Sequence, residues 1–173
     1  MPIELKPVTP GDTHLLTGLC HVLQDVVDGG ASVGFLAPLS EADAATYWHE
    51  IFALLGTSKR QLWIVEVDGQ VAGSVQLDPS PKPNGRHRAE IMKLIVHRDY
   101  RGRSISTMLM AEAEKAAKSI GCTLLVLDTE AQSSAEHVYK HLGWSRVGEV
   151  PGYALGADGV PRPNAYYYKQ LMR

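Results

Sequence analysis

A short basic turn before a helix-like segment is the first place where this sequence could bind a ligand. Residues 97–106 read HRDYRGRSIS and precede an apolar pattern of helical period. A helix N-terminus presents backbone N–H groups without intrahelical partners and a positive dipole end, and both suit a phosphate. The window 93–106 is also basic, with Lys93, Arg98, Arg101 and Arg103 against Asp99. The turn therefore indicates a phosphate site, and a solvated basic loop that only caps the helix is the alternative.

Two carboxylates lie in or directly after strand-like apolar runs, where an unpaired charge is costly. Glu90 is inside one such run, and Asp128 follows another at the carboxyl end of a predicted strand. Carboxylates in this setting can accept a proton from an amine or bind an ammonium group. The alternatives are a salt bridge from Glu90 to Arg86 or Arg88, and a helix-capping role for Asp128.

The histidines, cysteines and serines of the sequence do not indicate a metal site or a covalent intermediate. His137 and His141 are four residues apart on a predicted helix, a spacing that can hold zinc. No cysteine or third histidine stands in an adjacent motif, so we predict no metal site. No activated cysteine or serine stands next to a histidine, which argues against an acyl-enzyme intermediate.

Hydrophobic period and turn signals predict the elements that position these residues. Strands are expected at 3–7, 61–67, 70–77, 89–96, 123–127, 145–150 and 165–171, the last of them as an edge strand. Helices are expected from a capping signal at Thr9-Pro10 to about residue 27, and at 41–55, 104–119 and 133–143. Asp68-Gly69 between the second and third strands is a two-residue hairpin signal, and Ser40 is a helix N-cap signal.

Strand–helix–strand order over residues 89–129 predicts a parallel crossover, with an antiparallel hairpin before it and further strands after it. The fold class is therefore α/β in the mixed sense. We expect one domain over residues 1–173, with a central mixed, twisted sheet of about six to seven strands and helices on both faces. Ligands in such sheets bind at the carboxyl ends of the parallel strands and at the following helix N-terminus.

Composition excludes several classes of protein. The chain has 173 residues, and its net charge of −2 argues against nucleic-acid and anionic-membrane partners. No apolar run approaches the ~20 residues of a membrane span, and the first residues lack a signal-peptide pattern. Cys20 and Cys122 are expected to be reduced and buried, which favours a cytoplasmic location.

Two stretches carry a resemblance to a known family. The run KLIVHRDYRGR at 93–103 resembles the acetyl-CoA-binding signature of the GNAT superfamily of N-acetyltransferases, and VYKHLGW at 138–144 is similar to its second signature. Order and spacing match over about residues 60–150. The resemblance implies a GNAT fold, acetyl-CoA as co-substrate, and direct transfer of an acetyl group to a small-molecule amine.

The resemblance also implies roles for residues at matching positions. Backbone groups of Leu94, Ile95 and Val96 would meet the acetyl-pantetheine arm where their strand splays from the strand at 123–128. The pyrophosphate would lie against Arg101, Gly102, Arg103, Ser104, Ile105 and Ser106, and Ser134 would contact the pantetheine arm. Glu90 would act as base, and Asp128 would share that proton through a water or bind the substrate amine. Tyr139 would protonate the leaving thiolate, with a core tyrosine of structural role as the alternative. Phe35 and Trp48 are candidates for lining the substrate cleft, with core packing as the alternative.

The sequence departs from the family pattern Arg-x-x-Gly-x-Gly/Ala at two positions. Arg101 is followed by Ser104 and Ser106 where the family has small residues without a hydroxyl. We expect both serines to have helical dihedrals, so that glycine would serve only to let phosphate approach the backbone. Binding is then weakened by about 1 kcal/mol, the scale of one hydrogen bond. The departure also raises the alternative of a non-catalytic coenzyme A-binding or regulatory domain.

Further stretches, among them GGASVGF at 29–35, KPNG at 82–85 and VGEVPGY at 147–153, resemble the tabtoxin-resistance acetyltransferases within that superfamily. This narrower resemblance implies an amino-acid-like substrate, such as a β-lactam toxin, and a role in antibiotic or toxin resistance. The two strands that flank the sheet would also allow pairing across a homodimer.

Overall fold

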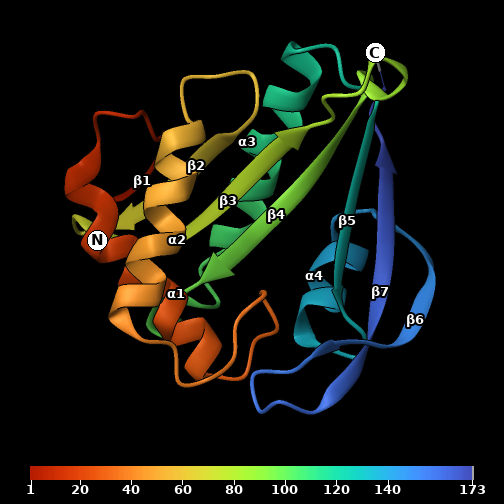
Figure 1. Ribbon diagram of the computed structural model, residues 1–173. Coiled ribbons are helices and arrows are strands. Elements are labelled where there is room, and N and C mark those ends of the chain that lie inside the picture. Colours follow the sequence, from red (N-terminus) through yellow and green to blue (C-terminus); the bar gives the residue numbers. More distant parts are fainter. Residues whose placement is uncertain (173) are drawn as a thin grey trace.

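The fold is built on one mixed sheet, and the computed structural model describes residues 1–172. Its seven strands are β1 (Ile3–Pro7), β2 (Gln61–Val67), β3 (Gln70–Pro79), β4 (Arg88–Val96), β5 (Leu124–Glu130), β6 (Ser145–Leu155) and β7 (Pro161–Gln170). They are arranged in the order β1-β2-β3-β4-β5-β7-β6. The β4–β5 pair is parallel and the other neighbours are antiparallel. This confirms the predicted mixed sheet and parallel crossover (Figure 1).

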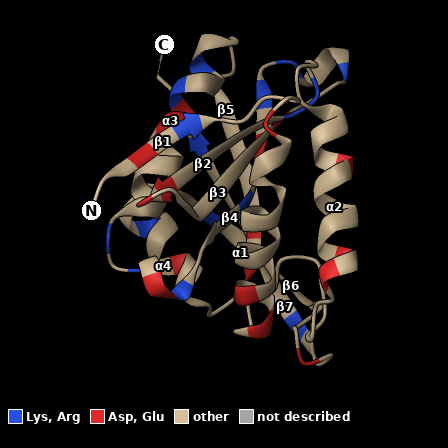
Figure 2. Ribbon diagram, turned by 90° about the vertical axis from the view of Figure 1, so that its left-hand side faces the viewer, with Lys and Arg blue, Asp and Glu red and all other residues tan. Residues whose placement is uncertain are grey.

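In the part of the chain that the structure describes, four α-helices cover the two faces of the sheet. They are α1 (Leu16–Asp28), α2 (Glu41–Leu54), α3 (Ile105–Ser119) and α4 (Ser134–His141). Figure 2 shows α1 and α2 on one side and α3 and α4 on the other. We call these the α1–α2 face and the α3–α4 face. None of the helices in residues 1–172 combines the length and the apolar character needed to cross a bilayer.

Alternation along the strands divides the apolar side chains between these two faces. Leu62 and Ile64 of β2 pack with α1 and α2, where Leu23 and Trp48 are fully buried. Their neighbours along β2 belong instead to the core under α3, around Leu109. The fold thus has two hydrophobic cores separated by the sheet. Cys20 and Cys122 are buried and not disulfide-bonded, as predicted.

Local signals predicted most element ends, and one of them was wrong. Ser40 caps α2, because its Oγ accepts a hydrogen bond from the Asp43 N–H at 3.0 Å. The signal at Thr9-Pro10 does not begin a helix. Instead the N–H and hydroxyl of Thr9 both donate to the Asp12 carboxylate at 2.8 Å, which closes a turn, and α1 begins only at Leu16.

The C-terminal hairpin is longer than the sequence predicted. The sequence predicts strands only at 145–150 and 165–171, whereas β6 extends to Leu155 and β7 begins at Pro161, and their pairing shifts register twice. Strand β7 lies between β5 and β6 and is not an edge strand. The edge is β6, because the long β7 pairs along β5 on its other side.

Candidate active site

Strands β4 and β5 separate after a short stretch of pairing. Their parallel register covers Arg88↔Leu124, Ala89↔Leu125 and Glu90↔Val126, and it ends there. Beyond this point β4 pairs with β3 and β5 pairs with β7. Figure 1 shows the two strands close together at one end and diverging toward the other. The backbone of Leu94, Ile95 and Val96 therefore has no β5 partner on that side, which is the splay that the resemblance implied.

A β-bulge bends β4 inside this divergent part. Ser74 pairs with Ile95 while Gln76 pairs with Met92, so that two residues of β4 lie opposite the single residue Val75 of β3. Lys93, in the bulge, has a φ of 50°. Positive φ is uncommon for a non-glycine residue and bulges of this kind re-aim side chains.

The turn between β4 and α3 presents a row of free backbone donors. The N–H groups of residues 102–107 donate to no acceptor in the described chain, and the first N–H to bond back is that of Met108, to the Ser104 carbonyl at 3.0 Å. Ser104 is the N-cap of α3 and its side chain makes no capping hydrogen bond. The geometry fits a phosphate, because all these donors lie at one helix N-terminus.

The prediction that Ser104 has helical dihedrals was wrong. Its φ of 58° and ψ of 18° place it in the left-handed region, whereas Ser106 lies within α3. Glycine at the first position thus serves backbone conformation as well as close approach. At Ser106, with ordinary helical backbone, only the argument from close approach remains.

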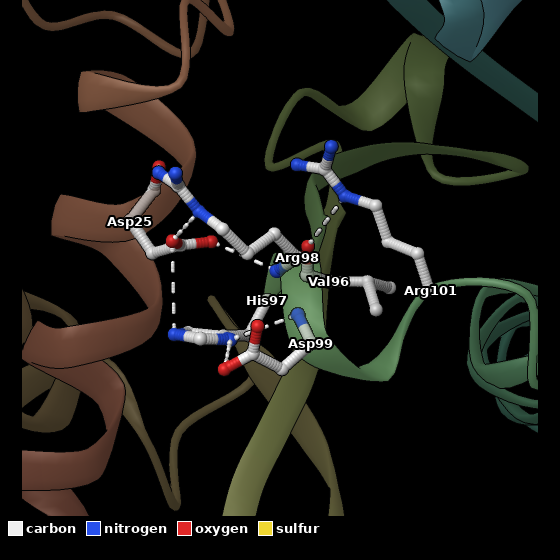
Figure 3. Close-up of polar contacts among 6 residues, drawn as sticks. All are labelled: Asp25, Val96, His97, Arg98, Asp99 and Arg101. Atoms are coloured by element: carbon white, nitrogen blue, oxygen red, sulfur yellow. Dashed lines mark hydrogen bonds and ion pairs between the residues drawn. The ribbon is translucent and has the colours of Figure 1, made fainter.

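Fewer basic side chains of the window 93–106 are available at the turn than the sequence suggests. Arg98 donates its N–H and Nε to Asp25 of α1, and its Nη2 donates to the Asp25 carbonyl (Figure 3). Lys93 lies beside Tyr47 on the α1–α2 face, away from the turn. Arg101, whose Nε donates to the Val96 carbonyl at 3.3 Å, and Arg103 remain exposed beside the free N–H groups.

Glu90 and Asp128 lie on the same face of the sheet, the α1–α2 face. Glu90 is in register with Val126, two residues before Asp128, and side chains two apart on a strand share a face. Burial raises the pKa of Glu90, and the nearby carboxylates of Asp128 and Asp78 raise it further. No ion pair joins Glu90 to an arginine in residues 1–172, so the predicted salt-bridge alternative is not formed.

The capping alternative for Asp128 is also not formed. Asp128 accepts a hydrogen bond from the Asn164 side chain of β7, and the N-cap of α4 is Ser133. Asn164 is buried, so it fixes the orientation of an otherwise exposed carboxylate. Sequence reasoning missed Asn164, since the register that brings β7 beside β5 has no local signal.

Tyr139 lies on the opposite face. It is buried in the α3–α4 core, with its ring centroid 6.1 Å from that of Trp144 and 5.8 Å from that of Tyr167. Burial raises the pKa of Tyr139, and Asp128 raises it further, so the hydroxyl is protonated at neutral pH. Glu90 and Tyr139 therefore lie on opposite faces of the sheet.

A buried carboxylate ties α4 to the last two strands. Glu136 accepts hydrogen bonds from Arg146 Nε at 2.9 Å, from the Gln132 N–H at 2.6 Å and from the Tyr167 hydroxyl. Burial alone would raise the pKa of Glu136, but these donors outweigh it and hold the pKa at about 2. Ser134 is the exposed first residue of α4, at the same end of the helix.

The α1–α2 face carries a polar cluster that sequence reasoning missed. Gln76 accepts from Arg60 Nη1 at 2.6 Å and donates to the Tyr47 hydroxyl at 2.9 Å, and Arg60 also pairs with Asp78 at 3.3 Å. Phe35 packs edge-on against Tyr47, with centroids 5.3 Å apart. The signal available in the sequence was a glutamine inside an otherwise apolar strand-like run, and the structure buries that glutamine fully.

Trp48 is wholly buried and belongs to the core rather than to a cleft. It follows Tyr47 on α2, and the two rings meet at 5.1 Å. Because neighbouring helix positions point about 100° apart, one aromatic of the pair faces the core and the other the polar cluster.

Comparison with known proteins agrees with this geometry. The model of the acetyltransferase (GNAT) family matches residues 30–144. N-acetyltransferase 8 of Rattus norvegicus is 32% identical over 89 residues, which are 50% of this chain and 40% of that protein. The chain thus spans less than half the length of this curated relative.

Solved structures match along nearly the whole chain. An N-acetyltransferase from Staphylococcus aureus Mu50 is 16% identical with a TM-score of 0.81, covering 99% of this chain and 100% of that one. The yncA structure from Salmonella typhimurium, solved with its cofactor acetyl-CoA, is 16% identical with a TM-score of 0.79, covering 100% and 96%. At these identities the likeness shows the fold.

Proposed function

The chain belongs to the acetyltransferase (GNAT) family, and from this premise we propose that it is an acetyl-CoA-dependent N-acetyltransferase acting on a small amine. The observation that carries the proposal is the row of free N–H groups at residues 102–107, directly after the strand that separates from β5. Acetyl-CoA, when bound, supplies an acetyl group on a thioester. The donors fit its pyrophosphate, and the divergent strands expose backbone for its pantetheine arm.

Residues around the turn would hold the nucleotide part of this co-substrate. The backbone N–H groups from Gly102 to Ser106 would receive the pyrophosphate, and the side chains of Arg101 and Arg103 add positive charge beside them. Ile105 contributes only its N–H, because its side chain is buried in the core. Leu94, Ile95 and Val96 would bind the arm through backbone groups, and Ser134 would approach it from α4.

Glu90 and Asp128 would handle the proton of the acceptor. An ammonium group must lose a proton before its nitrogen can attack a carbonyl, and a carboxylate with a raised pKa is a better base for that proton. Burial and the neighbouring carboxylates raise the pKa of Glu90, which supports Glu90 as the base. Asp128, oriented by Asn164, would bind the amine or relay its proton through a water.

Tyr139 would supply the proton for the departing thiolate. Burial keeps its hydroxyl protonated, and its position on the opposite face of the sheet from Glu90 separates the acid from the base. Transfer is then direct, within a ternary complex. Neither Cys20 nor Cys122 suits an acyl-enzyme, because burial raises the pKa of both thiols.

The acceptor in this proposal is amino-acid-like, in keeping with the resemblance to the tabtoxin-resistance acetyltransferases, and a β-lactam toxin of that kind is one candidate. Phe35, beside the polar cluster, would contact it. A role in toxin resistance, a cytoplasmic location and a homodimer paired through the exposed β6 belong to the same proposal.

Thiol release from acetyl-CoA tests the proposal. The purified protein is mixed with acetyl-CoA and a panel of amino acids and amines, and free thiol is followed over time. Turnover that falls by about 100-fold or more in both Glu90→Gln and Tyr139→Phe supports the mechanism. Calorimetric binding of acetyl-CoA without turnover of any amine would favour the coenzyme A-binding or regulatory domain instead.

A further inference from the structure

Lys93 is a half-buried cation that is not paired with a carboxylate. Among the ion pairs formed within residues 1–172 none includes Lys93, whereas Arg60, its neighbour in the polar cluster, is held by Gln76 and Asp78. Burial lowers the pKa of Lys93, and Arg60 lowers it further against the opposing effect of Asp128 and Glu90. A half-buried ammonium group without an ion pair can bind an anion from outside the chain, because the anion would offset the free-energy cost of burying the charge.

The β4 bulge directs this lysine to the α1–α2 face. Strict alternation would place residue 93 with Ile91, which is buried in the α3–α4 core. The bulge reverses that side, since Lys93 lies beside Tyr47 instead. The positive φ of 50° that this requires costs energy in a lysine, and such strain is concentrated at functional sites.

The surroundings of the Lys93 ammonium group could accommodate an anion. Its Nζ lies 5.6 Å from the centroid of the Tyr47 ring, and a Cβ placed on Gly34 would be 3.7 Å from it. Phe35 packs on the same tyrosine. The N–H groups of residues 32–36 donate to no acceptor in the described part of the chain. We call Gly34, Phe35, Tyr47 and Lys93 the lysine corner.

The lysine corner and the proposed base share one face of the sheet. Glu90 and Lys93 are three residues apart on β4, both on the α1–α2 face, and Asp128 faces them from β5. Asp128 and Glu90 both act electrostatically on Lys93, so positive and negative charge stand close together on this face. An α-amino acid carries its ammonium and its carboxylate on one carbon and could therefore meet both.

We propose that the lysine corner binds the α-carboxylate of the acceptor while its amine faces Glu90 and Asp128, so that Lys93 determines specificity for amino acids over their uncharged derivatives. This inference rests on the proposed function and adds to it the Lys93 ammonium as the group that binds the carboxylate of the acceptor. Lys93 is then a substrate-binding residue, and not part of the phosphate site where its place in the basic window suggested it.

The test compares L-amino acids with their α-carboxamides, which keep the amine and remove the negative charge. Thiol release gives kcat/KM for both members of each pair in the wild type, Lys93→Met and Lys93→Arg. We expect the wild type to prefer the acid, the preference to fall roughly 10- to 100-fold in Lys93→Met, and Lys93→Arg to retain most of it. Arg103→Met is the matched control, expected to weaken acetyl-CoA binding while leaving the preference for the acid in place.

Three results would overturn the inference. They are a wild type that prefers the carboxamides, an unchanged preference in Lys93→Met, or a Lys93→Met variant whose calorimetric affinity for acetyl-CoA falls as far as that of Arg103→Met. Failure of the proposed function gives a different result. In that case neither the amino acids nor their carboxamides cause thiol release from acetyl-CoA, with the wild type or with any variant.

Discussion

Glycine at Ser104 and glycine at Ser106 are expected to change stability in opposite directions. Ser104 has a φ of 58°, a backbone conformation that costs an L-residue with a Cβ about 1–2 kcal/mol and costs glycine almost nothing. Glycine also makes the unfolded chain more flexible, which takes back about 0.4–1 kcal/mol. Ser104→Gly is therefore expected to increase the free energy of unfolding by about 0.5–1 kcal/mol.

Ser106 is the matched control, because it lies two residues further on, inside α3. Its helical backbone gives glycine no advantage, and the lower helix propensity of glycine costs about 0.5 kcal/mol. For a chain of this length each kcal/mol corresponds to about 2–4 °C in Tm. Ser104→Gly is thus expected to raise Tm by about 2 °C and Ser106→Gly to lower it by about 1–2 °C.

Urea unfolding followed by circular dichroism, together with thermal scans, measures both variants. Equal destabilisation by the two substitutions would refute the reasoning, since it would mean that Ser104 is not held in a left-handed conformation in solution. Calorimetry with acetyl-CoA adds a second readout. Because the N–H donors do not depend on the Ser104 side chain, the affinity of Ser104→Gly is expected to stay within about fivefold of the wild type.

Three further predictions concern the carboxylates. Glu136→Gln is expected to lower the free energy of unfolding at pH 7 by about 2–3 kcal/mol. Because the folded-state pKa of Glu136 is held at about 2, below its usual value, the difference in stability between wild type and variant should disappear as pH falls from about 4.5 toward 2. Urea unfolding across that range measures the difference, and a difference that does not change with pH would contradict the prediction. Asp25 accepts a hydrogen bond from the Arg98 N–H and so holds the backbone of the turn that leads to the N–H groups of residues 102–107. Asp25→Asn is expected to loosen this turn and to lower acetyl-CoA affinity several-fold, and wild-type or higher affinity by calorimetry would contradict that reasoning. The rate of thiol release is expected to fall as pH drops through the raised pKa of Glu90, and a Glu90→Gln variant that keeps the same acidic limb would exclude Glu90 as its source.

Local sequence signals were sufficient wherever a single turn or cap decides the structure. Ser40 and Asp68-Gly69 were interpreted correctly because the side chain or the positive φ acts within a few residues. The Thr9 signal failed for a related reason. The same residue types also close an isolated turn, and Asp12 competes for the donors that a helix start would use.

The site was less predictable than the fold, because its charges are sorted by contacts far apart in the sequence. Arg98 is bound by Asp25, which is 73 residues away in the sequence, and no residue near Arg98 indicates that partner. Lys93 changes sides through a bulge that depends on the β3 register, so its place in a basic window was misleading. Glu90, by contrast, is a candidate from sequence alone, since a carboxylate within an apolar strand is conspicuous by itself, and its role as base stays a prediction.

The structure of the protein with acetyl-CoA bound tests the central claim most directly. The account predicts pyrophosphate oxygens within hydrogen-bond distance of the N–H groups of residues 102–107, with the pantetheine arm entering between β4 and β5 beside Leu94–Val96. Pyrophosphate bound elsewhere on the chain, or an arm that bypasses the opening between these strands, would contradict it.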